Sequence, residues 1–150
     1  MDTKFEDIVS EIKKTVDLFP YNIAIIEDGI PTLSYSQMWE DATCIANRLK
    51  EQCDSSEYVT VELPKSSRYI CAILGCWMAG KAFVPIGKDL PDSRKRYIEE
   101  TVDTNLSITE YNYDDFFKSQ PIDSVETLTA STPAYVIFSS GTTGKPKGIL

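Results

Sequence analysis

The sequence predicts an α/β fold, in which a layered and mostly parallel sheet is flanked by helices. The first observation is a β-α-β unit: residues 58–63 alternate like a strand, residues 66–80 show helical spacing, and residues 82–86 form another short apolar run. Such a unit joins parallel strands through a right-handed crossover. The second observation is that a helix after Pro91 and a strand near residues 106–108 continue the alternation.

The chain opens with a predicted amphipathic helix and a hairpin. The helix carries apolar residues at helical spacing and stops before Pro20; they are Phe5, Ile8, Val9, Ile12 and Val16. Residues 22–27 and 32–35 then flank Asp28 and Gly29, a pair typical of tight turns. We therefore expect two short antiparallel strands after the first helix.

The next two helices have clear start and stop signals. Ser34 and Gln37 have the spacing of a capping box, in which each side chain bonds the backbone of the other residue. The helix that they begin has one apolar stripe and ends near Cys53; the stripe is Met38, Ala42, Ile45, Ala46 and Leu49. Ser66 or Ser67 caps the following helix, which Gly80 terminates.

The last third of the chain is less regular. Pro91 begins a helix, and the pattern then weakens over residues 110–133, which we expect to be mainly surface connection. Residues 134–138 are short, apolar and rich in β-formers, so they predict a buried strand. The residues that follow it should emerge at the carboxyl end of the sheet, where ligands of doubly wound sheets bind.

The segment after this strand has the composition of a phosphate-binding loop. Its glycines let backbone N–H groups approach an anion, and its hydroxyls and lysines add donors and positive charge. The predicted phosphate-binding residues are Ser139, Ser140, Gly141, Thr142, Thr143, Gly144 and Lys147. A triphosphate is the natural ligand of such a set, whereas a solvated role fits Lys145 equally well.

This segment has two competing interpretations, and its spacing disfavours the first. The P-loop of NTPases has four residues between its glycines and a Ser or Thr after its lysine, whereas here only two residues separate Gly141 from Gly144 and Pro146 follows Lys145. Residues 149–150 also predict a strand, so no helix N-terminus is expected beneath the phosphates. A solvated hairpin turn is the second alternative.

Three stretches in register resemble the adenylate-forming enzymes. Residues 135–148 (YVIFSSGTTGKPKG) resemble the signature loop of that superfamily, and residues 33–38 (LSYSQM) and 78–86 (MAGKAFVPI) resemble two elements that precede it. Residues 90–94 (LPDSR) are most similar to the branch that contains adenylation domains of nonribosomal peptide synthetases and D-alanine-activating ligases. The acyl-CoA synthetase branch is the alternative.

The resemblance implies a chemistry. The expected activity is ATP-dependent activation of a small carboxylic or amino acid as an acyl-adenylate, with release of pyrophosphate and then transfer to a thiol of CoA or of carrier-protein phosphopantetheine. ATP and Mg²⁺ are the implied cofactors, and Lys147 is the implied catalytic residue because it offsets charge on the leaving pyrophosphate. A nucleotide-binding regulator or scaffold without catalysis, and an NTPase that forms ADP, are the alternatives from other classes.

The resemblance also sets an expectation for domain organisation. Members of the superfamily are several times longer than 150 residues. We expect residues 1–150 to be the amino-terminal portion of the large AMP-binding domain and to be inactive alone. The remaining substrate pocket and the small C-terminal domain would lie outside it.

Composition excludes several function classes. A hydrophobic share of 42% supports a packed core, and a net charge of −8 argues against nucleic acid or an anionic membrane as a partner. Histidine is absent, so we expect no His-based catalysis and no metal site formed by the chain itself. The four cysteines lack metal-ligand spacing, and the start of the chain has no secretory signature, so a cytoplasmic location with reduced thiols is expected.

Overall fold

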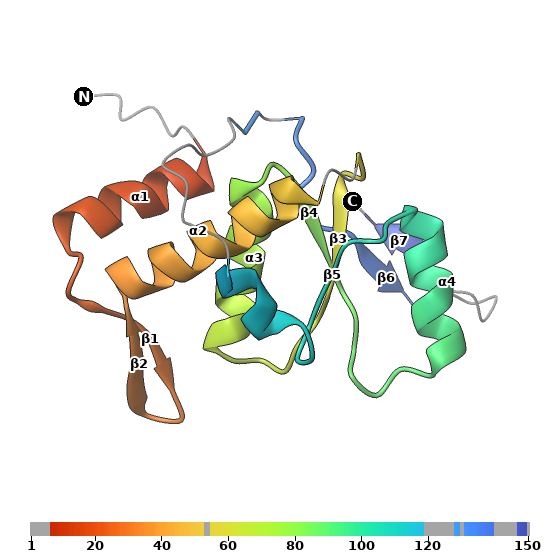
Figure 1. Cartoon of the computed structure of the whole chain (residues 1–150), viewed down its shortest axis with the longest axis horizontal. Coiled ribbons are helices and arrows are strands. Elements are labelled where there is room, and N and C mark those ends of the chain that lie inside the picture. Colours follow the sequence, from red (N-terminus) through yellow and green to blue (C-terminus); the bar gives the residue numbers. More distant parts are fainter. Residues whose placement is uncertain (1–6, 53–54, 119–127, 130, 140–146, 150) are drawn as a thin grey trace.

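A three-stranded parallel sheet of order β4-β3-β5 lies between two layers of helices (Figure 1). The computed structural model describes residues 7–52, 55–118, 128–129, 131–139 and 147–149. The strands of the sheet are β3 (Tyr58–Glu62), β4 (Ala82–Pro85) and β5 (Ser107–Thr109). Helices α2 (Tyr35–Glu51) and α3 (Ser67–Met78) cover one face, and α4 (Asp92–Val102) covers the other. The predicted α/β class, parallel pairing and β-α-β unit are confirmed.

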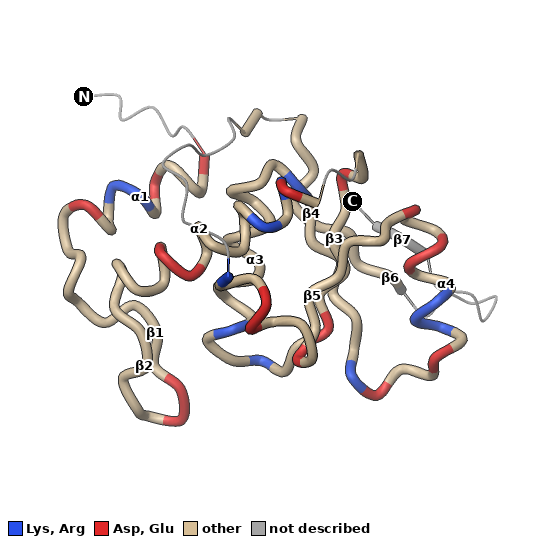
Figure 2. The backbone as a smooth tube through the Cα atoms, viewed as in Figure 1, with Lys and Arg blue, Asp and Glu red and all other residues tan. Residues whose placement is uncertain are grey.

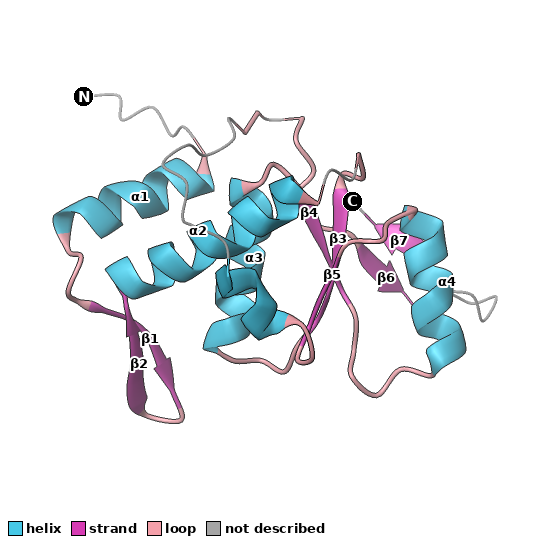
Figure 3. Cartoon of the chain, in the orientation of Figure 1, coloured by secondary structure: helices cyan, strands magenta, loops and turns pink. Residues whose placement is uncertain are grey.

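The amino-terminal elements form as the local signals predict. Helix α1 (Ile8–Leu18) begins after Asp7, whose carboxylate accepts a hydrogen bond from the Ser10 N–H at 2.9 Å. Strands β1 (Ile23–Glu27) and β2 (Ile30–Ser34) form an antiparallel hairpin that extends away from the helices (Figure 3). Asp28 and Gly29 make its turn with φ of 48° and 79°. Both residues therefore take the left-handed conformation that a two-residue hairpin turn requires.

The larger hydrophobic core lies between the sheet and helices α2 and α3. The predicted capping box starts α2, since Ser34 Oγ accepts from the Gln37 N–H at 3.2 Å and Gln37 Oε1 accepts from the Ser34 N–H at 2.9 Å. Ser66 rather than Ser67 caps α3. Helices α2 and α3 approach so closely that a Cβ on Gly75 would lie 2.6 Å from Ile45 Cγ2. Gly75 is thus required by packing rather than by backbone conformation.

A smaller core holds α4 against the other face of the sheet. Its buried residues come from β4 and the residue after it, from α4 and from the segment before β6; they are Val84, Ile86, Ile98, Val102 and Val136. Helix α4 begins directly after Pro91, as predicted, and ends at Asp103 in the left-handed conformation. Acidic residues precede and follow the short basic run at residues 94–96 along this helix (Figure 2).

The carboxyl-terminal region differs from the prediction in two respects. The prediction for residues 134–138 was a buried strand, but β6 (Ile137–Ser139) is shorter, and Ile137 is 48% exposed while Val136 is 5% exposed. The region predicted as surface connection contains a 3₁₀ helix, η1 (Tyr113–Lys118), which buries Tyr113 and Phe116 in the larger core. This helix lies against α2, a long-range contact that no local periodicity indicates.

The cysteines and charged groups of the described residues give no sign of a metal centre. Cys71 and Cys76 are buried free thiols and Cys44 is a half-buried one, while Cys53 lies outside the described residues. Burial raises the pKa of Cys71 and Cys76 to about 12, so both stay protonated and unreactive at neutral pH. Within the described ranges, no group of three His, Cys, Asp or Glu side chains is placed to bind a metal ion.

No helix in these ranges has the length and apolar character needed to span a membrane.

Replacing Gly75 with Ala should destabilise the fold. The added Cβ would also meet Ile45 Cβ at 2.8 Å and the Ala42 carbonyl oxygen at 3.0 Å, neither of which moves without shifting a helix. We expect the free energy of unfolding to fall by about 1 to 3 kcal/mol, although Ala is the better helix former. Urea denaturation measures this. Gly87→Ala is the matched control, because its Cβ would meet Leu90 at an ordinary 3.5 Å; equal stability of the two variants would contradict the proposed close helix contact.

Candidate functional site

The candidate site lies where the chain leaves the parallel sheet after residue 136. Tyr135 bridges Phe83 of β4 in a parallel sense. The Phe83 N–H donates to the Ala134 oxygen at 3.2 Å, and the Val136 N–H donates to the Phe83 oxygen at 3.0 Å. Residues 134–136 therefore extend the sheet beyond β4, and the residues after them emerge at its carboxyl edge, where ligands bind in sheets of this kind.

The predicted phosphate-binding residues are only partly described. Ser139 ends β6 and pairs with Lys147, which begins β7 (Lys147–Ile149), in an antiparallel register. Ser140, Gly141, Thr142, Thr143 and Gly144 lie outside the described residues, as does Lys145. The pairing brings the backbones of Ser139 and Lys147 together, one at each end of the predicted loop.

The strand β7 helps to distinguish a phosphate-binding loop of the predicted kind from a P-loop. A P-loop continues into a helix, whereas the chain continues here as a strand, as the sequence predicted. A phosphate-binding loop and a plain hairpin turn both agree with the antiparallel pairing of β6 and β7. The backbone thus argues against the P-loop class and leaves the hairpin alternative open.

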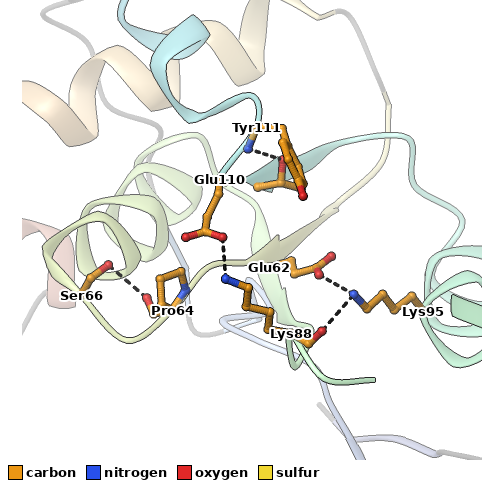
Figure 4. Close-up of polar contacts among 8 residues, drawn as sticks. Glu62, Pro64, Ser66, Lys88, Lys95, Glu110 and Tyr111 are labelled. Atoms are coloured by element: carbon orange, nitrogen blue, oxygen red, sulfur yellow. Dashed lines mark hydrogen bonds and ion pairs between the residues drawn. The ribbon is translucent and has the colours of Figure 1, made fainter. Parts of the chain in front are cut away.

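Two ion pairs cross the carboxyl edge of the sheet (Figure 4). Lys95 of α4 contacts Glu62, the last residue of β3, and also donates to the Lys88 carbonyl oxygen at 3.2 Å. Lys88, which follows β4, lies 2.8 Å from a carboxylate oxygen of Glu110, which follows β5. Together these contacts fasten α4 and the loop before it to the ends of all three strands.

The electrostatics of these pairs agree with their geometry. The hydrogen bond that Lys95 donates to Glu62 raises the pKa of Lys95, and the hydrogen bond that Lys88 donates to Glu110 raises the pKa of Lys88. Lys95 belongs to the basic run at residues 94–96, yet its side chain is only 20% exposed because it contacts Glu62. Sequence reasoning missed Glu62, Lys88 and Glu110 as a set. Their shared position, just at or after strand ends, was the available signal.

The described surface also has a hollow beside the β1–β2 hairpin. It has a volume of about 600 Å³ and lies between the β1–β2 hairpin and the start of α3, with Ile25, Ile26, Tyr69 and Ile70 among its lining residues. Glu27 at its rim accepts a hydrogen bond from the Ser67 N–H, which holds the pKa of Glu27 below its usual value. This carboxylate occupies the N-terminus of α3, so it serves the helix rather than a ligand.

Separating Lys95 from Glu62 should weaken the attachment of α4. Lys95→Met removes the cation that pairs with the Glu62 carboxylate, which is only 27% exposed. Glu62→Gln removes the carboxylate that pairs with the Lys95 ammonium group, which is only 20% exposed. We expect each variant to unfold at lower urea concentration, and the double variant to lose less stability than the two single losses added together. Lys118→Met is the control, because the side chains of Lys118 and Asp115 are 76% and 55% exposed. Strict additivity would show that Lys95 and Glu62 do not interact.

Comparison with known proteins shows similarity along most of the chain. The family described as AMP-binding enzyme matches residues 12–127, a range that ends before the predicted phosphate-binding residues. The dapdiamide synthesis protein DdaD of Enterobacter agglomerans is 28% identical over 144 residues, which are 94% of this chain and 25% of that protein. Surfactin synthase subunit 1 of Bacillus subtilis is 34% identical over 133 residues, 79% of this chain and 4% of that protein.

A solved structure confirms the fold independently. It is NpsA-ThdA from Klebsiella oxytoca, described as an artificially fused adenylation-PCP di-domain NRPS, with a TM-score of 0.83 at 18% identity. The matched region is 100% of this chain and 33% of the NpsA-ThdA chain. The chain therefore spans a third or less of the length of these three proteins.

Proposed function

The chain belongs to the AMP-binding enzyme family, and on that premise we propose that it carries the phosphate-binding segment of an adenylate-forming ligase. The observation that supports this most is the parallel attachment of residues 134–136 to β4. It brings the segment that begins at Ser139 to the carboxyl edge of the sheet, where a nucleotide binds in related architectures. The activity, substrates and partners that follow concern the full-length protein.

The proposed reaction has two steps. An oxygen of a small carboxylic or amino acid attacks the α-phosphorus of ATP; the new oxygen–phosphorus bond forms as the bond to the bridging oxygen breaks, and pyrophosphate leaves. A thiol then attacks the carbonyl carbon of the acyl-adenylate and AMP leaves with the electron pair. Similarity to surfactin synthase and to an adenylation-PCP di-domain favours carrier-protein phosphopantetheine over CoA as the thiol.

The chain's own residues supply binding and charge in this proposal. Backbone N–H groups of residues 139–144 and the hydroxyls of Thr142 and Thr143 hold the β- and γ-phosphates, and Lys147 offsets the charge that develops on pyrophosphate. Ser139 and Lys147 are paired across β6 and β7, which fits their joint action on one ligand. Mg²⁺ would supply positive charge at the phosphates and reduce their repulsion of the incoming carboxylate.

The products of ATP turnover test the class of reaction. The full-length protein should form AMP and pyrophosphate from ATP when a suitable acid is present, and should exchange labelled pyrophosphate into ATP. A panel of amino acids and aryl acids, analysed by chromatography of the nucleotides, identifies the acid. Formation of ADP would make the protein an NTPase, and nucleotide binding without turnover would make it a regulator.

Replacing Lys147 with Ala tests its proposed role. The loss of one charge-assisted phosphate contact should be worth roughly 2 to 3 kcal/mol, so pyrophosphate exchange should slow by on the order of a hundredfold. Binding of the acid should change little. Lys145→Ala is the control because Lys145 is assigned no phosphate contact. Unaltered exchange by the Lys147 variant, or an equal loss in both variants, would remove Lys147 from the catalytic residues.

A further inference from the structure

Trp77 reaches the segment that leads to the candidate site from the layer formed by α2 and α3. It lies in the last turn of α3, and its indole Nε1 donates a hydrogen bond to the Ala134 carbonyl oxygen at 2.9 Å. The contact joins residues 57 positions apart in the sequence. The same oxygen accepts from the Phe83 N–H, so Ala134 is held by the sheet and by α3 together.

Aromatic contacts extend this attachment along one face of the sheet. The rings of Trp77 and Phe83 have centroids 6.0 Å apart at an interplanar angle of 59°. The rings of Phe83 and Tyr135 follow at 5.9 Å and 39°. These tilted geometries are the favourable ones for aromatic pairs. On the opposite face, Val136 and Phe138 pack in the smaller core with α4.

The hydrogen bond from Trp77 is not required to satisfy a buried group. Trp77 is half-buried and Ala134 is exposed, so water can replace either partner at low cost. The bond therefore contributes little to the stability of the whole fold. What it does determine is where residues 134–136 lie relative to α3, since an indole N–H on a packed helix has a fixed direction.

We propose that Trp77 is a positioning residue for nucleotide binding, which holds Ala134 and thereby the strand β6 that leads to the phosphate-binding segment. This inference rests on the proposed function. Trp77 touches neither ATP nor the acid, and it acts only through the backbone of residues 134–139. Its effect should therefore appear in the use of ATP and should be absent from the use of the acid.

The variant Trp77→Phe separates the hydrogen bond from the aromatic packing. Phe keeps a ring beside Phe83 but has no N–H to donate. In pyrophosphate-exchange assays of the full-length protein, we expect the KM for ATP to rise about fivefold, with the KM for the acid and the thermal midpoint unchanged. The control is Trp39→Phe, which removes the other tryptophan, half-buried on α2 beside Lys13, and should change neither KM.

A second measurement follows the strand directly. Hydrogen exchange of the Val136 amide, which donates to Phe83, should be faster in Trp77→Phe than in the wild type or in Trp39→Phe. An unchanged KM for ATP in an active enzyme, or equal exchange at Val136, would overturn the positioning role and leave the proposed function intact. Equal increases in both KM values with a lowered thermal midpoint would show a structural role only. A wild type without pyrophosphate exchange would overturn the proposed function and this role with it.

Discussion

Two backbone hydrogen bonds between Phe83 and residues 134–136 connect the candidate site to the rest of the molecule. They extend a parallel sheet whose other strands come from the middle of the sequence. Because parallel strands share their carboxyl edge, this attachment places the start of the predicted phosphate-binding segment beside the loop that follows β4. Without it, residues 134–136 would lose their backbone pairing with the sheet, and β6 and β7 would be held by side-chain contacts such as those with α3 and α4.

The rest of the described structure supports this attachment from both sides. The larger core holds α2 and α3 against the sheet, and the close contact at Gly75 brings α3 near enough for Trp77 to contact the strand that leads to the site. The smaller core and the Lys95–Glu62 pair hold α4 on the other face. The edge of the sheet is thus bounded by rigid elements, which suits a site that must align a nucleophile with phosphorus.

Local features of the chain were predictable because their causes lie within a few residues. The turn at Asp28 and Gly29 and the capping box of Ser34 and Gln37 need only neighbouring atoms, and the structure confirms both. The burial of η1 and the pairing of Lys95 with Glu62 were missed because their partners are distant in sequence. The strand before the loop was predicted in place but not in extent, since its pairing with both β4 and β7 limits its regular part.

The candidate site likewise has features that the sequence predicts locally and features that depend on distant contacts. The glycine, hydroxyl and lysine composition of residues 139–148 is a local signal and indicated phosphate chemistry, whereas the contribution of Trp77 depends on a contact across the fold.

The most direct test is a crystal structure of the full-length protein with a non-hydrolysable ATP analogue and Mg²⁺. We expect the β- and γ-phosphates within hydrogen-bond distance of the backbone N–H groups of Thr142 and Thr143, at the edge of the sheet next to Phe83. A triphosphate bound elsewhere, for example in the hollow between the β1–β2 hairpin and α3, would contradict the proposed phosphate-binding role.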